Sequence, residues 1–122
     1  MGFKDKYSFD ERLIESNRII NKYPCRLPII CERIKNATDC PTIDKNKYLV
    51  PDDFAFGQFM FVIRKRLKLT PEKALFMFIK DVVPHSTQSI KEIYNANVDL
   101  DGFLYVRYSF ENTFGSASNS LH

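Results

Sequence analysis

Basic residues frame one segment of this chain, and their spacing indicates a surface that binds acidic groups. Between Lys45 and Lys68 the sequence holds six bases and only two acids. This segment carries a net charge of +4, against +3 for the whole chain, so the positive charge is local. Within it, Lys47–Val50 is a β-type run that ends at Pro51, because proline cannot donate a ladder hydrogen bond. An edge strand with a basic rim is suited to bind an extended acidic peptide.

Residues suited to catalysis or metal binding form no recognisable set. Cys25, Cys31 and Cys40 are odd in number and match no metal-ligand spacing, which favours a reducing compartment. Residues 97–102 begin like a calcium loop, but Tyr108 stands where the bidentate Glu is required, so a turn explains them better. Without a catalytic triad, paired carboxylates or a phosphate loop, we expect neither an enzyme nor a bound metal.

The composition is typical of a soluble globular domain. The chain has 122 residues, 44% of them apolar and 27% charged, which predicts a single domain with one core. No apolar run approaches the roughly 20 residues that cross a bilayer, and no secretory signal is visible. The 11 Phe are too many for so small a core, so we expect some of them to line surface pockets.

Local signals place the elements that position the basic surface. Ser8 and Glu11 form a capping box for a helix that ends near Lys22, because Pro24 disfavours helix at the residue before it. Thr70-Pro71-Glu72 resembles a helix start, but a buried run follows directly, so we interpret it as a turn. Apolar periodicity predicts the other elements: strands at 26–33, 47–50, 75–79 and 103–108, a long helix from about 56 to 67, and a short helix after Ser89.

This order of elements predicts an α+β fold. Two strands, a helix, a strand, a short helix and a strand are typical of the ubiquitin-like β-grasp, with a four-stranded mixed sheet, a central helix and here an N-terminal helical extension. A ferredoxin-like α+β layer is the alternative. We expect one domain over 1–115, with N-terminal helices at about 1–22 and the β-grasp core at about 26–110. The Ser/Asn-rich stretch 116–122 has no means of packing and forms a tail.

A series of short motifs supports a more specific assignment. In chain order these are Lys22-Tyr23-Pro24, Arg26-Leu27-Pro28-Ile29-Ile30, Asp44-Lys45-x-Lys47-Tyr48-Leu49-Val50-Pro51, Gly57-Gln58-Phe59, Ile63-Arg64-Lys65-Arg66, Gly102-Phe103-Leu104-Tyr105-Val106 and Phe114-Gly115. Together they resemble the autophagy ubiquitin-like modifiers, the GABARAP and light-chain-3 group, over about residues 3–115.

The resemblance implies processing and lipid attachment at the end of the domain. A cysteine protease would cleave the Gly115–Ser116 bond, with Phe114 beside it, and remove the tail. Activating and conjugating enzymes would then join Gly115 to phosphatidylethanolamine, with no other cofactor. The resemblance therefore places the protein in the cytoplasm and, after lipidation, on autophagosomal or vacuolar membranes. Glycine suits the acyl donor because it lacks a Cβ and can enter a narrow active site.

The resemblance also implies a site for acidic aromatic-x-x-aliphatic peptide motifs carried by autophagy receptors and adaptors. The aromatic pocket maps onto Glu15, Ile19, Pro28, Ile30, Lys47, Leu49 and Phe103. The aliphatic pocket maps onto Tyr48, Val50, Pro51, Phe54, Phe59 and Val62, and the electrostatic rim onto Lys45, Arg64 and Arg66. Phe54 and Phe56 are bulkier than the family's usual aliphatic residues, which predicts a shallower aliphatic pocket.

Other interpretations of the same residues remain open. The bases at 64–66 could bind RNA or form a solvated helix end, but a peptide rim is favoured and no nucleic acid is expected as a partner. A monomer in solution is expected. The alternative function is a non-conjugated β-grasp adaptor, in trafficking or cytoskeletal binding, that keeps its tail.

Overall fold

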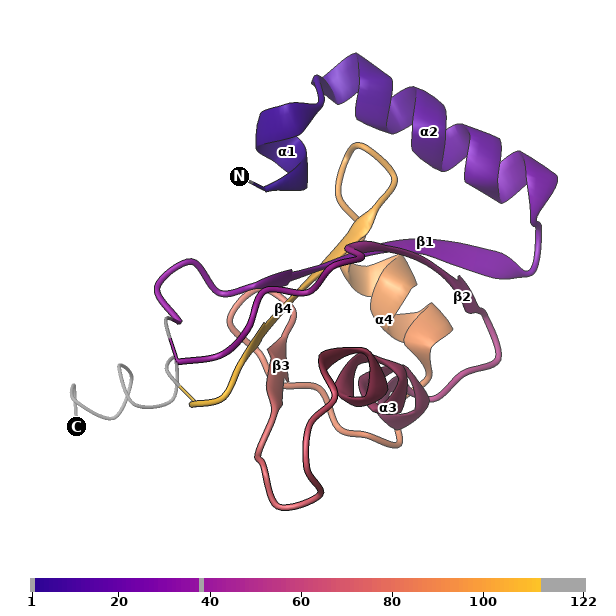
Figure 1. Ribbon diagram of the computed structural model, residues 1–122. Coiled ribbons are helices and arrows are strands. Elements are labelled where there is room, and N and C mark those ends of the chain that lie inside the picture. Colours follow the sequence, from indigo (N-terminus) through magenta and orange to yellow (C-terminus); the bar gives the residue numbers. More distant parts are fainter. Residues whose placement is uncertain (1, 38, 113–122) are drawn as a thin grey trace.

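A four-stranded mixed sheet lies at the centre of the computed structural model, which describes residues 2–37 and 39–112 (Figure 1). Its strands are β1 (Arg26–Arg33), β2 (Lys47–Pro51), β3 (Phe76–Phe78) and β4 (Leu104–Ser109). The strands lie in the order β2-β1-β4-β3. β1 pairs antiparallel with β2 and parallel with β4, and β3 pairs antiparallel with β4. The mixed sheet is therefore as predicted, and β2 is an edge strand.

Helices cover both faces of this sheet (Figure 1). One face carries α1 (Phe3–Lys6) and α2 (Phe9–Lys22), and the other carries α3 (Phe56–Leu67) and α4 (Ile90–Asn97). The predicted capping box starts α2: Glu11 N–H donates to Ser8 Oγ at 3.1 Å, and Ser8 N–H donates to the Glu11 carboxylate at 2.8 Å. In the described part of the chain, no helix combines the length and the apolarity needed to cross a membrane.

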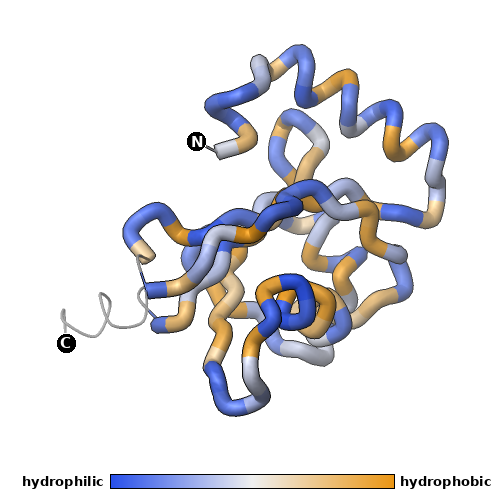
Figure 2. Tube along the Cα trace, in the orientation of Figure 1, coloured by the Kyte–Doolittle hydropathy of each residue, from blue (hydrophilic) through white to orange (hydrophobic). Residues whose placement is uncertain are grey.

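Two apolar clusters follow from the alternation of side chains along the strands. The larger one lies between the sheet and α3 and includes Ile29, Cys31 and Phe59. The smaller one lies between the sheet and the N-terminal helices, where Ile30 and Phe103 pack with residues of α1 and α2. The spaced apolar residues of α2 are visible as orange bands along this helix (Figure 2). Both faces of β1 are thus covered, as its apolar sequence predicts.

Three strands differ from the prediction in their boundaries: β2 includes Pro51, β3 is shorter, and β4 is shifted by one residue to Leu104–Ser109. The strand expected at 75–79 is shortened to Phe76–Phe78, because Ile79 and Val82 exchange backbone hydrogen bonds in a tight turn. Lys80, inside this turn, has a left-handed φ of 56° that no strand residue adopts. The last strand begins after Phe103, whose N–H donates to the Asp101 carboxylate at 2.9 Å.

Candidate functional site

β2 lies at an edge of the sheet, so the hydrogen-bonding groups on its outer side can pair with another strand. Cys31 N–H donates to the Asn46 carbonyl at 2.8 Å, which fixes the hydrogen-bonding alternation of the β1–β2 ladder. Antiparallel ladders alternate, so Lys47 and Leu49 direct their N–H and C=O groups away from β1. A peptide aligned with this edge can therefore pair with two residues of β2.

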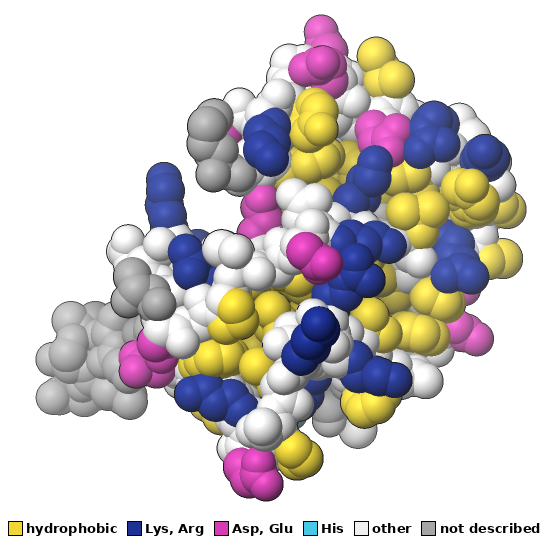
Figure 3. Space-filling model, viewed as in Figure 1, with side chains coloured by type: hydrophobic (Ala, Val, Ile, Leu, Met, Phe, Trp, Pro, Cys, Tyr) yellow, Lys and Arg dark blue, Asp and Glu magenta, His cyan; other side chains and the backbone are white. Residues whose placement is uncertain are grey.

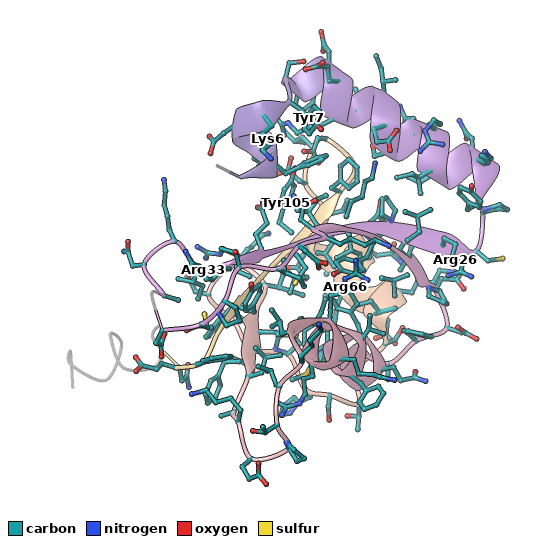
Figure 4. All side chains as sticks on the ribbon, viewed as in Figure 1. Lys6, Tyr7, Arg26, Arg33, Arg66 and Tyr105 are labelled. Atoms are coloured by element: carbon teal, nitrogen blue, oxygen red, sulfur yellow. The ribbon has the colours of Figure 1, made fainter. Side chains whose placement is uncertain are left out.

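One edge carbonyl already has a partner that the sequence did not predict. Arg26 Nη1 donates to the Leu49 carbonyl oxygen at 3.1 Å. Arg26 opens β1, and its side chain reaches across β2 because the register places it opposite Pro51. Figure 4 shows Arg26 beside the start of β1 and Arg66 extending from α3 toward the sheet. An incoming strand that pairs with Leu49 therefore competes with the Arg26 guanidinium for this carbonyl oxygen.

The predicted aromatic pocket is assembled but closed. Ile19, Ile30 and Phe103 are fully buried and pack together, and the half-buried Leu49 lies against them. Pro28, on the same face of β1, is also buried. The structure therefore brings these predicted residues together, but an aromatic side chain can reach the buried Ile30 and Phe103 only if the groups that cover them move.

An ion pair spans this pocket from α2 to β2. Lys47 Nζ donates to the Glu15 carboxylate, and Arg18 donates to the same carboxylate at 2.8 and 3.0 Å. The pKa of Glu15 is lowered from 4.5 to about 2, chiefly by the hydrogen bond from Arg18. Burial raises this pKa, and the hydrogen bond from Lys47 lowers it further. Lys47 is therefore engaged within the protein before any peptide binds.

An open hollow adjoins the closed pocket on the side of α1. It measures about 410 Å³ and shares Glu15 and Lys47 with the predicted pocket. Its other lining residues were not predicted: Phe3, Lys6, Tyr7, Glu11, Arg12 and Asn46. Figure 4 shows Lys6 and Tyr7 at the α1 end of the molecule, above Tyr105 of β4. The sequence signal for this hollow is weak: two aromatic and two basic residues lie close together at positions 3–7.

The residues predicted for the aliphatic pocket lie between β2 and α3. Tyr48, Val50 and Phe59 are buried in the larger core cluster, and the Tyr48 and Phe59 rings meet edge to face with centroids 5.7 Å apart. Phe54 packs against the same cluster, Pro51 is half-buried, and Val62 is 37% exposed. Most of this set is therefore core, and Val62 with Pro51 offers its accessible part.

The basic rim divides into residues that face β2 and one that does not. Lys45 Nζ lies 5.3 Å from the centroid of the Tyr48 ring, and Arg66 Nε lies 2.9 Å from the Asp44 carboxylate. Arg64 instead donates from Nη2 to the Thr70 carbonyl at 2.8 Å, beyond the end of α3. Figure 3 shows Lys and Arg side chains gathered in the middle of this face, with hydrophobic side chains on both sides.

A buried polar network holds α2 against the start of β4. Asp101 is fully buried, and its carboxylate accepts hydrogen bonds from Arg12 and from the Tyr105 hydroxyl, both at 2.5 Å. Ser16 Oγ donates to the Asp101 carbonyl at 2.6 Å. Gly102 has a φ of 89°, and a Cβ there would lie 2.3 Å from Ser16 Oγ, so only glycine fits. The residues that resembled a calcium loop therefore anchor the N-terminal helices.

The predicted processing site lies outside the described residues. Phe114, Gly115 and the Gly115–Ser116 bond all follow Asn112, the last residue that the structure describes.

Comparison of the sequence with protein families and known relatives gives one consistent result. The family model described as autophagy protein Atg8, ubiquitin like, matches residues 11–115. Autophagy-related protein 8 of Mycosarcoma maydis is 56% identical over 114 residues, which are 93% of this chain and 96% of that protein. The protein of the same name from Schizosaccharomyces pombe is 53% identical and covers 93% of both chains.

Solved structures agree with this sequence similarity. The crystal structure of Trypanosoma brucei ATG8 is 40% identical, with a TM-score of 0.85 over 89% of this chain and 93% of that one. Plasmodium falciparum Atg8, solved in complex with a Plasmodium falciparum Atg3 peptide, is 32% identical, with a TM-score of 0.84 over 91% and 97% of the two chains. The predicted ubiquitin-like β-grasp with N-terminal helices is confirmed.

Proposed function

The chain belongs to the Atg8 family of ubiquitin-like autophagy proteins, and from this premise we propose that it is a lipid-anchored modifier that docks peptides at the β2 edge. Its role as a ubiquitin-like modifier of autophagy follows from that membership. As a modifier it is the substrate of other enzymes, and we expect no catalysis by the chain itself.

The proposed attachment point is Gly115. A cysteine protease cleaves the Gly115–Ser116 bond, with Phe114 as the neighbouring hydrophobic contact, and the exposed glycine carboxyl forms an amide with the amine of phosphatidylethanolamine. The observation that carries this proposal is the family match over residues 11–115, because it ends at that glycine. An activating and a conjugating enzyme perform the transfer, and the lipid brings the chain to autophagosomal or vacuolar membranes.

The proposed binding surface is the edge of β2 with its two flanking pockets. The Plasmodium relative was solved with an Atg3 peptide, and we infer that this chain binds an Atg3-like peptide of its conjugating machinery, which we assign to the β2 edge. The edge groups of Lys47 and Leu49 would pair with the peptide backbone. An aromatic side chain would enter beside Ile30 and Phe103, an aliphatic one beside Val62, and acidic flanks would meet Lys45 and Arg66. Receptors and adaptors with acidic aromatic-x-x-aliphatic motifs would use the same surface.

The test is the intact mass of the protein recovered from the membrane fraction of cells. We expect a chain that ends at Gly115 and carries one phosphatidylethanolamine. Gly115→Ala is the matched control, and it should leave the chain full-length and outside the membrane fraction. A wild-type chain that extends to His122 without lipid, or a variant that reaches membranes as wild type does, would instead support a non-conjugated adaptor.

A further inference from the structure

The loop between α3 and β3 holds a modification motif that the proposed function does not use. Thr70 is the only serine or threonine in the 122-residue sequence that precedes a proline, and Lys73 stands three residues after it. Proline-directed protein kinases recognise this pattern of hydroxyl residue, proline and nearby base. We propose that Thr70 is phosphorylated by a kinase of this class, and that Arg64 and Lys73 bind the phosphate. This inference does not depend on lipid conjugation or on peptide docking.

Thr70 is placed where a kinase can reach it. Thr70 and Pro71 are both exposed and belong to no helix or strand. The loop protrudes at the bottom of the view in Figure 1, and its tip is hydrophilic in Figure 2. Lys73 N–H donates to the Thr70 carbonyl at 3.1 Å, and this hydrogen bond closes the turn. A short exposed turn opens easily into the extended form that kinases bind.

The residues around Thr70 carry an excess of positive charge, which favours a doubly charged phosphate there. From Arg64 to Lys73 the chain has five bases and a single acid, Glu72. The Arg64 guanidinium already lies at this residue, since its Nη2 donates to the Thr70 carbonyl at 2.8 Å. Lys73 is the fourth residue of the turn that Thr70 begins, and such residues lie within about 7 Å of each other at Cα. A phosphate on Thr70 adds three strong acceptor oxygens to a residue that Arg64 already contacts and that is joined to Lys73 by the turn.

The position of Lys73 gives the modification a structural consequence. Lys73 Nζ lies 4.3 Å from the centroid of the Phe110 ring, which follows the end of β4. A phosphate attracts an ammonium group more strongly than an aromatic face does, because it carries a full charge. Phosphorylation of Thr70 therefore draws Lys73 away from Phe110 and changes the environment of that ring.

The chemical step is an ordinary phosphoryl transfer from ATP supplied with the kinase. Thr70 Oγ1 attacks the γ-phosphorus, so that an Oγ1–P bond forms. The bond from that phosphorus to the β,γ-bridging oxygen breaks, and ADP leaves. The hydroxyl proton passes to the catalytic base of the kinase.

The first experiment tests the site itself. The full chain is incubated with a cyclin-dependent kinase and MgATP, and the products are mapped by mass spectrometry. We expect one phosphoryl group, on Thr70, with most of the rate lost in Pro71→Ala and no incorporation in Thr70→Val. An unmodified Thr70, or a Pro71→Ala variant that is modified as fast as wild type, would overturn the proposal.

The second experiment tests whether the fold binds the phosphate. The phosphothreonine is titrated by phosphorus NMR in the folded protein and in a phosphorylated peptide of residues 67–74. Nearby cations favour the dianion, so we expect the second phosphate pKa to lie about half a unit lower in the protein. Arg64→Gln and Lys73→Gln should each raise it, whereas Lys91→Gln, an exposed control on α4, should not. Equal pKa values in protein and peptide, or an unchanged Phe110 ring resonance, would refute binding by Arg64 and Lys73.

Discussion

Arg26 Nη1 lies 3.1 Å from the carbonyl oxygen of Leu49, so a side chain of β1 occupies a hydrogen-bonding position at the open edge of β2. Edge strands with unpaired groups are prone to unwanted pairing, and a charged side chain over the edge reduces that risk. The same contact opposes the docking of a peptide strand. Arg26 thus has two opposed effects on an acidic peptide: it blocks the edge and it attracts the charge.

These two effects can be separated with Arg26→Met, which keeps the apolar stem and removes the donors. For an aromatic-x-x-aliphatic peptide without acidic flanks, we expect the variant to bind about twofold to fivefold more tightly, since no guanidinium competes with the peptide for the Leu49 carbonyl. For the acidic version of the peptide at low salt, the lost attraction should cancel most of that gain. Titration calorimetry with both peptides measures this. Weaker binding of the neutral peptide by the variant would show that Arg26 does not block the edge.

Charge reversal at the rim should weaken binding of the acidic peptide. Lys47 and Arg66 come from β2 and α3 and lie on the side of the predicted docking edge. We expect Lys47→Glu with Arg66→Glu to reduce affinity at least about tenfold at low salt, and less at high salt. Lys91→Glu, an exposed base on α4, is the matched control and should leave affinity unchanged. Equal affinities for the double variant and wild type would remove the β2 edge as the acidic-peptide site.

Sequence reasoning predicted the elements well because their signals are local. The Ser8–Glu11 capping box, the proline after α2 and the alternation along β1 each depend on neighbours a few residues apart. The strand that ends at Phe78 was predicted too long, because the turn at Lys80 depends on backbone geometry that composition does not reveal.

The contacts that already occupy the candidate site were harder to predict, because they join residues far apart in the sequence. The resemblance placed Glu15 and Lys47 in one pocket but did not predict the ion pair between them, across 32 residues of sequence. Nor does the sequence reveal that Arg26 reaches Leu49, 23 residues away. The different directions of Arg64 and Arg66, both predicted for the rim, do have a signal in the sequence. Residues two apart on a helix point in different directions, and the structure separates these two side chains.

The ion pairs of Glu15 predict a specific loss of stability in acid. The pKa of Glu15 is lowered from 4.5 to about 2 in the folded state, so its contribution is fully present above about pH 4.5 and is lost as the pH falls through 2. The carboxylate is partly solvated, so we expect a contribution of only about 1 kcal/mol. Urea unfolding of wild type and Glu15→Gln at pH 6 and pH 2.5 measures it. The difference between the two proteins should shrink at the lower pH, and a constant difference would contradict this assignment.

Lys68 at the end of α3 offers a stabilising substitution. It is the C-cap residue and has a left-handed backbone, with φ 57° and ψ 43°. This conformation strains a residue with a Cβ, whereas glycine adopts it freely. We expect Lys68→Gly to raise the free energy of unfolding by about 0.5–1 kcal/mol. Lys65→Gly, inside the same helix, should lower it by a similar amount. A loss of stability in Lys68→Gly would show that the lysine side chain has a compensating role.

The strongest effect on stability is expected at the network that joins α2 to β4. Asp101→Asn keeps the shape of the side chain but removes the charge that faces Arg12, whose side chain is only 11% exposed. Breaking a buried ion pair leaves the other charge uncompensated, so we expect a loss of about 3 kcal/mol. Asp99→Asn is the matched control: its carboxylate pairs with Lys4 at 2.8 Å but is 29% exposed, so it should cost less than about 1 kcal/mol. Urea unfolding of the two variants compares these costs. Similar losses for both would mean that the buried network does not anchor α2.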